Sequence, residues 1–300
     1  MQSILTQLSG AGIPFAEHEP LSRHTTFRIG GPVRALVLPR DEEELVRAVT
    51  ILRASGQAPI LIGNGSNMLA EDEPIERIAI KTFGGVAALR QMEDGALYVS
   101  GGASLARAAV FARELGLTGF EFAHGIPGTL GGAVYMNAGA YGGEMAQVVR
   151  CVHYLDEGLT PQVLRGEAIG FSYRHSRFSE EPNLVILGAE IALQPGEKTE
   201  IQARMDEMAS KRRASQPLEF PSAGSTFKRP KAGYAAALID QAGLKGYRIG
   251  GAEVSEKHAG FVVNRGGATC ADVKLLMEHI QKTVEQRTGI MLEPEVALIR

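Results

Sequence analysis

The chain has only two cysteines and lacks any long hydrophobic run. Cys151 and Cys270 stand far apart in sequence, without the CxxC spacing that is typical of redox or metal motifs. No apolar stretch approaches the roughly 20 residues that a transmembrane helix needs, and residues 1–15 lack the basic and apolar segments of a signal peptide. We therefore expect a cytoplasmic protein in a reducing compartment, without a metal site.

The chain also lacks a strong excess of charge. Its formal net charge is -3 and its pI is near 6.2, so the sequence shows no excess of basic residues of the kind that binds nucleic acid. The one basic cluster, Lys211–Arg213, is typical of a solvated helix end. With 300 residues, 44% of them hydrophobic, the chain has enough material for two or three globular domains.

Capping residues and hydrophobic patterns predict a mixed α/β chain. Asp41 is expected to cap a helix over 41–55 in a capping box with Glu44, with Gly56 just beyond its end. Ser104 is expected to cap a helix whose apolar face includes Leu105, Ala108, Ala112 and Leu115. Further helices are predicted over 197–215, 234–242 and 271–287, the last capped by Thr269 with Asp272, and strands over 58–62, 97–100, 184–193, 260–264 and 295–299.

Two glycine-rich segments are candidates for binding a ligand. Residues 62–67 read IGNGSN, a turn after a strand whose backbone N–H groups can face a phosphate. The segment matches neither a Walker loop nor a Rossmann fingerprint, and a structural turn is the alternative. Residues 125–143 contain seven glycines, too many for a regular helix, and glycine permits close approach to a flat ligand. A glycine-packed turn between core segments is the alternative there.

Polar side chains that suit an anionic substrate appear in two later segments. Arg174 lies between aromatic residues in FSYRHSRF, and its guanidinium can hold a carboxylate or phosphate. Ser225 follows a glycine in SAGSTFKRP, with Lys228 and Arg229 close behind. A surface ion pair for the arginine and a serine that caps backbone are the structural alternatives.

The last candidates are two glutamates and a histidine. Glu293 and Glu295 flank a proline at the start of the predicted final strand, where residues two apart share a face. Exposed strand-end glutamates are common, and His258 is more typical of a structural hydrogen bond than of catalysis.

In order, these segments resemble the UDP-N-acetylenolpyruvoylglucosamine reductase family, from RHTTFRIGGP at 23–32 to LEPEV at 292–296. The resemblance covers nearly the whole chain. It implies a vanillyl-alcohol-oxidase-type FAD-binding domain of two α/β subdomains, over 1–80 and 81–195, with FAD between them. A C-terminal α/β substrate-binding domain over 196–300 would follow, its last strand returning to the active site. The short segment between Arg174 and Ser225 resembles the compact second class of the family.

The same resemblance assigns roles to individual residues. NADPH would reduce the bound, non-covalent FAD, and the reduced flavin would then reduce UDP-N-acetylglucosamine enolpyruvate to UDP-N-acetylmuramate for peptidoglycan synthesis. Ser225 would be the proton donor, and Arg174 and Glu295 would stabilise the enolate. Tyr173, Lys228, Arg229 and His258 would bind substrate. The residues expected to bind FAD are Thr26, Ile29, Gly63, Asn64, Gly65, Ser66, Asn67, Gly128, Thr129, Gly132, Ala133 and Asn137.

Two rival functions remain open on the sequence. Another FAD-dependent oxidase of the same fold would share the FAD segments but not the turn at Ser225. A non-catalytic nucleotide-binding module would need only the turn at 63–67.

Overall fold

The structure is a computed structural model that describes residues 2–82 and 88–300. The chain divides into two compact units, each assembled from separated stretches of sequence. The predicted division at residues 80 and 195 remains a prediction. Unit 1 consists of Met1–Glu17, Ala35–Asn64 and Arg77–Lys211, and unit 2 of His18–Arg34, Gly65–Glu76 and Arg212–Arg300.

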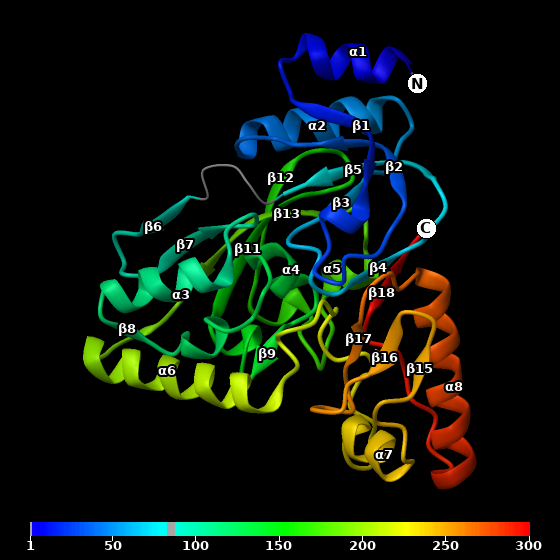
Figure 1. The fold of residues 1–300 in the computed structure, drawn as a ribbon. Helices are drawn as coiled ribbons and strands as arrows, with labels where there is room; N and C mark the ends of the chain where they lie inside the picture. Colours follow the sequence, from blue (N-terminus) through cyan, green and yellow to red (C-terminus); the bar gives the residue numbers. More distant parts are fainter. Residues whose placement is uncertain (1, 83–87) are drawn as a thin grey trace. The chain divides into compact units, whose positions relative to one another are not determined.

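A five-stranded antiparallel sheet forms the centre of unit 1 (Figure 1). Its strand order is β12-β11-β13-β7-β6. The buried side chains of β7, β11 and β13 belong mainly to one hydrophobic core, with Val99, Val152 and Ala189 fully buried. The strands are β6 Leu89–Gln91, β7 Leu97–Ser100, β11 Val149–Leu155, β12 Pro161–Arg165 and β13 Val185–Ile191.

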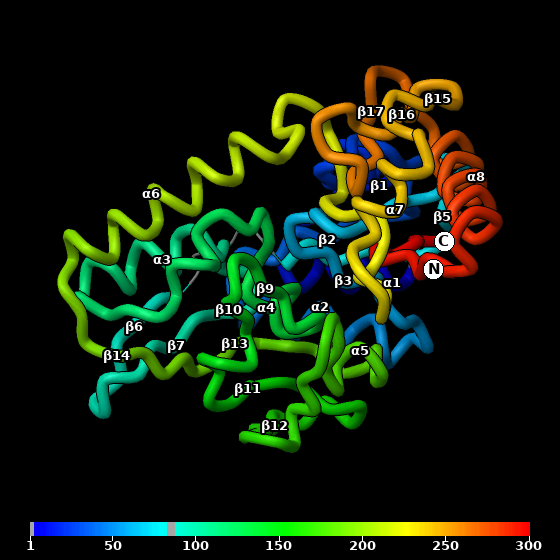
Figure 2. The backbone as a smooth tube through the Cα atoms, turned by 90° about the horizontal axis from the view of Figure 1, so that it is seen from below, coloured from blue at the N-terminus to red at the C-terminus, as the bar shows by residue number. Residues whose placement is uncertain are grey.

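Helix α3 (Leu105–Glu114) of unit 1 and helix α6 (Lys198–Ser215), most of which belongs to unit 1, lie side by side in Figures 1 and 2. Arg113 of α3 donates a hydrogen bond to Gln202 of α6. The predicted cap of α3 is confirmed, because the Ser104 hydroxyl accepts from the Arg107 N–H at 3.2 Å. Leu115 was wrongly placed on its buried face: it is 37% exposed, since the helix already ends at Glu114.

A second sheet has the order β1-β2-β5-β3. Helix α2 (Glu42–Ala54) contributes its buried side chains to a core with α1 and β5. Asp41 caps α2 as predicted, but the capping box is only half formed, because the Glu44 carboxylate accepts from the N–H and guanidinium of Arg40 instead. The other elements are α1 Gln2–Gly10, β1 Phe15–Pro20, β2 Pro32–Val37, β3 Ile60–Ile62 and β5 Ile75–Lys81.

The glycine-rich segment 125–143 contains a short helix, α4 (Leu130–Tyr135), which corrects the expectation that it has too many glycines for one. Thr129 caps this helix, and Gly131 packs so closely that an added Cβ would lie 3.1 Å from the Gly101 carbonyl oxygen. The remaining short elements of unit 1 are β8 Leu117–Thr118, η2 Glu121–Ala123, β9 Gly139–Ala140, β10 Gly143–Glu144, η3 Met145–Gln147, η4 Gly166–Ile169, α5 Arg177–Glu180 and β14 Gln194–Pro195.

Unit 2 packs helices α7 and α8 with a three-stranded antiparallel sheet of order β15-β16-β17 (Figure 1). Thr269 and Asp272 form the predicted capping box of α8, and Gly289 ends that helix with a φ of 71°. No helix of the described residues has the length and apolarity needed to cross a bilayer. The elements are η1 Leu21–Arg23, β4 Met68–Ala70, α7 Ala235–Gln241, β15 Arg248–Ile249, β16 Ala252–Val254, β17 Val262–Asn264, α8 Cys270–Thr288 and β18 Ala297–Ile299.

Candidate active site

The turn after β3 packs against the start of α4 within unit 1. A Cβ added to Gly63 would lie 2.4 Å from the Thr129 hydroxyl oxygen, so only glycine fits there without displacement. The Asn64 side-chain amide donates to the Pro127 carbonyl at 2.7 Å. Two candidate segments that lie more than sixty residues apart in sequence are therefore in direct contact.

Backbone hydrogen bonds fix the residues around Thr129. The Gly128 carbonyl accepts from the Leu105 N–H at 3.1 Å, and the Leu130 N–H donates to the Ala103 carbonyl at 2.9 Å. The Thr129 hydroxyl accepts from the Gly132 N–H at 3.3 Å. The predicted FAD-binding residues Gly128, Thr129, Gly132 and Ala133 thus lie in one short, well-anchored segment.

Asn137 anchors the turn that carries Arg174. Its side chain is buried, donates to the Ser172 carbonyl at 3.0 Å and accepts from the Ala146 N–H at 2.9 Å. Ser172 and His175 exchange backbone hydrogen bonds, which leaves Tyr173 and Arg174 at the tip of a tight turn. Asn137 therefore positions this turn, whereas its contact with FAD remains a prediction.

Tyr173 and Arg174 present an aromatic and a cationic group from that tip. Tyr173 is 49% exposed, and the Arg174 guanidinium carbon lies 5.0 Å from the centroid of its ring. Arg174 adopts a φ of 56°, which is uncommon for a residue with a side chain. A strained, well-anchored arginine suits a role in binding an anion.

In unit 2, the Thr25–Gly31 segment is hydrogen-bonded to the turn around Ser225, which we call the serine turn. The Thr26 hydroxyl donates to the Ser222 carbonyl at 2.7 Å, and the Thr26 N–H donates to the Gly65 carbonyl at 3.1 Å. Gly65 has a φ of 62°, and an added Cβ would lie 2.2 Å from the His24 carbonyl oxygen. The side chain of Ile29, another predicted FAD residue, belongs to the hydrophobic core of unit 2.

The serine turn is held by Thr226, the next residue along the chain. The Thr226 N–H donates to the Gly260 carbonyl at 2.9 Å, and its hydroxyl accepts from the Val262 N–H at 3.0 Å. Gly224 adopts a φ of 76°. The half-buried Ser225 hydroxyl makes no hydrogen bond with the described residues, so the alternative in which it caps backbone does not hold.

Glu295 lies beside this turn through backbone contacts. Its N–H donates to the Thr226 carbonyl at 2.8 Å, and its carbonyl accepts from the Asn67 side-chain amide at 3.1 Å. The final strand begins at Ala297 rather than at Glu295, so the expectation that Glu293 and Glu295 share a strand face was wrong. Phe227 and Pro294 form only an isolated bridge there.

The predicted substrate residues of unit 2 have distinct surroundings. The Lys228 ammonium pairs with the Glu293 carboxylate, which is exposed. The guanidinium carbon of Arg229 lies 4.1 Å from the ring centroid of Tyr234. His258 accepts from the Gly260 N–H through Nδ1 at 3.2 Å, and burial lowers the pKa of its imidazole. His258 is therefore built into the same loop that holds Thr226.

Asn264 is a positioning residue that the sequence analysis missed. It ends β17, and its buried side chain donates to the Phe27 carbonyl at 3.1 Å. Its side-chain oxygen also accepts from the N–H groups of Gly266 and Ala268 at 2.9 and 3.2 Å. An asparagine directly after two valines was the one available signal, because an amide at the end of an apolar strand needs partners.

The comparisons with known proteins cover both parts of the chain. The sequence model of the FAD binding domain matches residues 33–158, and that of the C-terminal domain of UDP-N-acetylenolpyruvoylglucosamine reductase matches residues 216–299. A protein of that name from Caldanaerobacter subterraneus is 46% identical over 284 residues, which cover 94% of this chain and 92% of the relative. Its counterpart from Clostridium perfringens is 44% identical over 280 residues, or 93% of this chain and 91% of the relative.

A solved structure agrees with these matches. The crystal structure of UDP-N-acetylenolpyruvylglucosamine reductase from Thermus caldophilus has a TM-score of 0.80 and 32% identity, and the match covers 96% of this chain and 99% of that one. The predicted fold, a vanillyl-alcohol-oxidase-type FAD-binding domain followed by an α/β substrate-binding domain, is confirmed. The chain belongs to the UDP-N-acetylenolpyruvoylglucosamine reductase family.

Proposed function

We propose that the protein uses NADPH and bound FAD to reduce UDP-N-acetylglucosamine enolpyruvate to UDP-N-acetylmuramate, a precursor of peptidoglycan. The observation that carries this proposal is the turn at Ser225, whose hydroxyl has no hydrogen-bond partner among the described residues and whose backbone is held on both sides. It lies in the segment that matches the C-terminal domain of the reductase family. An oxidase that shares only the FAD-binding fold would not require the turn at Ser225.

The residues after β3 fit the pyrophosphate of FAD. The backbone N–H groups of Asn64, Gly65 and Ser66 find no acceptor among the described residues. Successive N–H groups of this kind form an anion-binding nest. Buried or half-buried donors otherwise have partners, so these N–H groups are available to a ligand. Bound FAD would supply the redox chemistry, the transfer of a hydride from NADPH to the enolpyruvyl double bond.

The residues of the chain must then stabilise the negative charge that develops on the substrate and supply one proton. Hydride addition to the terminal carbon leaves negative charge on the neighbouring carbon and its carboxylate, and Arg174 counters that charge with its guanidinium. Ser225 holds the proton on Oγ that this carbon takes up, which requires fixed geometry because a hydroxyl is a weak acid. Glu295 helps Arg174 to stabilise the enolate through hydrogen bonding, and Lys228 and Arg229 pair with the diphosphate.

The test compares Ser225→Ala with Ser222→Ala, a serine of the same turn whose backbone carbonyl accepts from Thr26. In Ser225→Ala, flavin reduction by NADPH is expected to stay within about twofold, while reoxidation by the enolpyruvyl substrate slows by roughly 10²–10⁴-fold, the usual contribution of a general acid. Stopped-flow flavin absorbance under low oxygen separates the two half-reactions. Unchanged reoxidation would remove Ser225 from the mechanism, and absence of reoxidation by the enolpyruvyl compound in the unaltered protein would refute the proposed substrate.

The location follows from the same chemistry. We place the reaction in the cytoplasm, where NADPH is regenerated and where buried thiols such as those of Cys151 and Cys270 stay reduced. Fractionation of source cells followed by detection of the protein checks this.

A further inference from the structure

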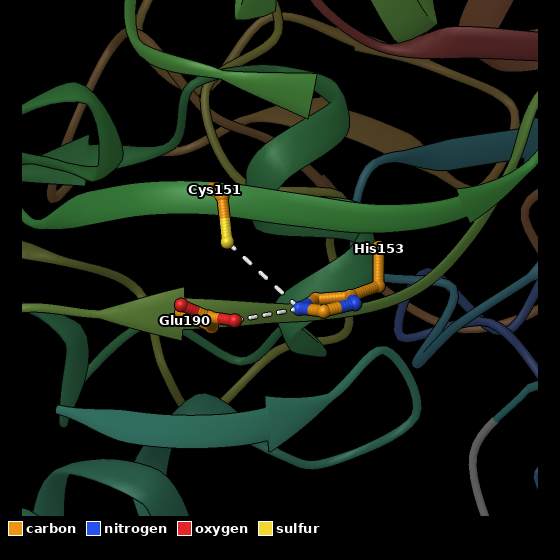
Figure 3. Close-up of side chains that lie close together, drawn as sticks. All are labelled: Cys151, His153 and Glu190. Carbon is orange, nitrogen blue, oxygen red and sulfur yellow. Dashed lines mark hydrogen bonds and ion pairs between the residues drawn. The ribbon is translucent and has the colours of Figure 1, made fainter. Parts of the chain in front are cut away.

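Three side chains with metal-binding donor atoms meet on the five-stranded sheet of unit 1. Cys151 and His153 are two residues apart on β11, so they project from the same face of the strand, and Glu190 lies on the neighbouring strand β13. Figure 3 shows the three side chains converging. The Cys151 Sγ lies 3.8 Å from His153 Nε2, and the same Nε2 lies 2.9 Å from Glu190 Oε1.

We propose that Cys151, His153 and Glu190 form a Zn²⁺ site with three protein ligands and one open position. One donor atom from each lies within 4.8 Å of the others. In a tetrahedral site with Zn–S of about 2.3 Å and Zn–N of about 2.0 Å, sulfur and nitrogen stand roughly 3.5 Å apart. The 3.8 Å between Sγ and Nε2 is close to that value, so small side-chain rotations suffice.

The combination of donors selects the metal. A thiolate disfavours Mg²⁺ and Ca²⁺, which take oxygen ligands, whereas sulfur, imidazole and carboxylate together suit Zn²⁺. Glu190 reaches the ligand set because Cys151 pairs with it directly across the two strands. This explains why cysteine spacing alone gave no metal motif: the third ligand comes from a strand thirty-seven residues beyond His153.

The hydrogen bonds of Glu190 leave one of its carboxylate oxygens facing the cluster. Arg150 donates to Oε2 of Glu190, so Oε1 is left to face His153 and the metal. A carboxylate ligand is commonly held by such an outer hydrogen bond. Arg150 also pairs with Asp94. Asp94 and Glu190 therefore share the charge of Arg150.

A metal ion also has a route of entry. Cys151 is fully buried and the Glu190 side chain is 6% exposed, but the His153 side chain is 31% exposed. Solvent therefore reaches the imidazole edge of the cluster. A water or hydroxide from that side would fill the open position.

The test uses chelator-treated, flavin-loaded protein and Co²⁺ as a spectroscopic substitute for Zn²⁺. A tetrahedral Co²⁺ site gives d–d absorption at wavelengths beyond those of oxidised flavin, and Zn²⁺ should displace it with one equivalent per chain. Zn²⁺ competition against a chromophoric chelator gives the affinity. We expect Cys151→Ser to weaken binding by about 100-fold or more, since even outer-shell changes cost roughly 10–100-fold.

Cys270→Ser is the matched control, because Cys270 is the other buried free cysteine and contributes nothing to the cluster. It should retain full Zn²⁺ affinity. His153→Gln provides a second test with less risk to folding, because this side chain is partly exposed, and it too should abolish the d–d absorption. Absence of Zn²⁺ binding in the unaltered protein, or binding that survives both Cys151→Ser and His153→Gln, would overturn the proposal.

Discussion

Replacing Asn264 with leucine removes three hydrogen bonds and keeps the number and branching of the side-chain heavy atoms. The Asn264 amide bonds to the carbonyl of Phe27 and to the N–H groups of Gly266 and Ala268. Phe27 and Ala268 are buried, so their backbone groups lose their partner without gaining water, whereas Gly266 is exposed and can be hydrated. Leaving a buried polar group unpaired costs about 1–3 kcal/mol each.

The expected loss is therefore about 4–5 kcal/mol, with about 2 kcal/mol for each of the two buried groups and a smaller contribution from Gly266. The substitution also frees the segment from Thr25 to Ile29 from β17, so less flavin should remain bound after purification. Asn183→Leu is the control, since Asn183 is exposed and its amide makes a single bond to Glu157. Surface changes of that kind usually stay within about 0.5 kcal/mol.

Urea unfolding followed by circular dichroism measures the stability, and the ratio of visible to ultraviolet absorbance measures the flavin content. The urea midpoint should fall with little change in slope. A decrease below about 1 kcal/mol, comparable to the exposed control, would mean that water replaces the Asn264 amide and that the buried-partner argument is wrong.

Two further predictions test other parts of the molecule. Gly63→Ala should reduce bound flavin several-fold, because the new Cβ would lie 2.4 Å from the Thr129 hydroxyl oxygen. Gly10→Ala is the control and should leave the flavin content unchanged, because a Cβ there would have no atom within 4 Å. The ratio of visible to ultraviolet absorbance measures the flavin content of both variants. Burial raises the pKa of the Glu121 carboxyl, but hydrogen bonds from Thr118, backbone and Arg204 outweigh it, so the pKa is lowered from 4.5. Its contribution to stability is thus present above about pH 4.5 and is lost as the pH falls through the lowered pKa. The difference in urea midpoint between the unaltered protein and Glu121→Gln should therefore be smaller at pH 4 than at pH 7.

Local signals in the sequence predicted local structure well. Asp41, Ser104 and Thr269 all accept the hydrogen bond expected of a cap, because a cap is decided within four residues of chain. No helix was predicted within 125–143 because glycine has a low helix propensity, yet α4 forms where Thr129 caps it and tertiary packing holds it. Leu115 shows the usual uncertainty at a helix end.

Contacts between distant segments could not be predicted from the sequence. The motif order singled out the segments around Gly63, Arg174, Ser225 and Glu295 as candidates, but it did not predict the hydrogen bonds that anchor each of them. Thr226 is an example: nothing in its local sequence distinguishes its hydroxyl, which accepts from Val262 thirty-six residues away. Such a bond depends on strand placement, which periodicity alone does not determine.

The polar side chains of the candidate site differ in their hydrogen bonding, and this difference separates effects on folding from effects on catalysis. Asn137, Thr226 and Asn264 have their side-chain polar atoms bonded to backbone groups of the protein. Ser225, by contrast, has a hydroxyl without a partner among the described residues. Substituting one of the first three removes hydrogen bonds that the folded state already makes, and so must change stability together with activity. Substituting Ser225 removes no such bond, so a loss of activity there at unchanged stability would be direct evidence that the hydroxyl serves the reaction.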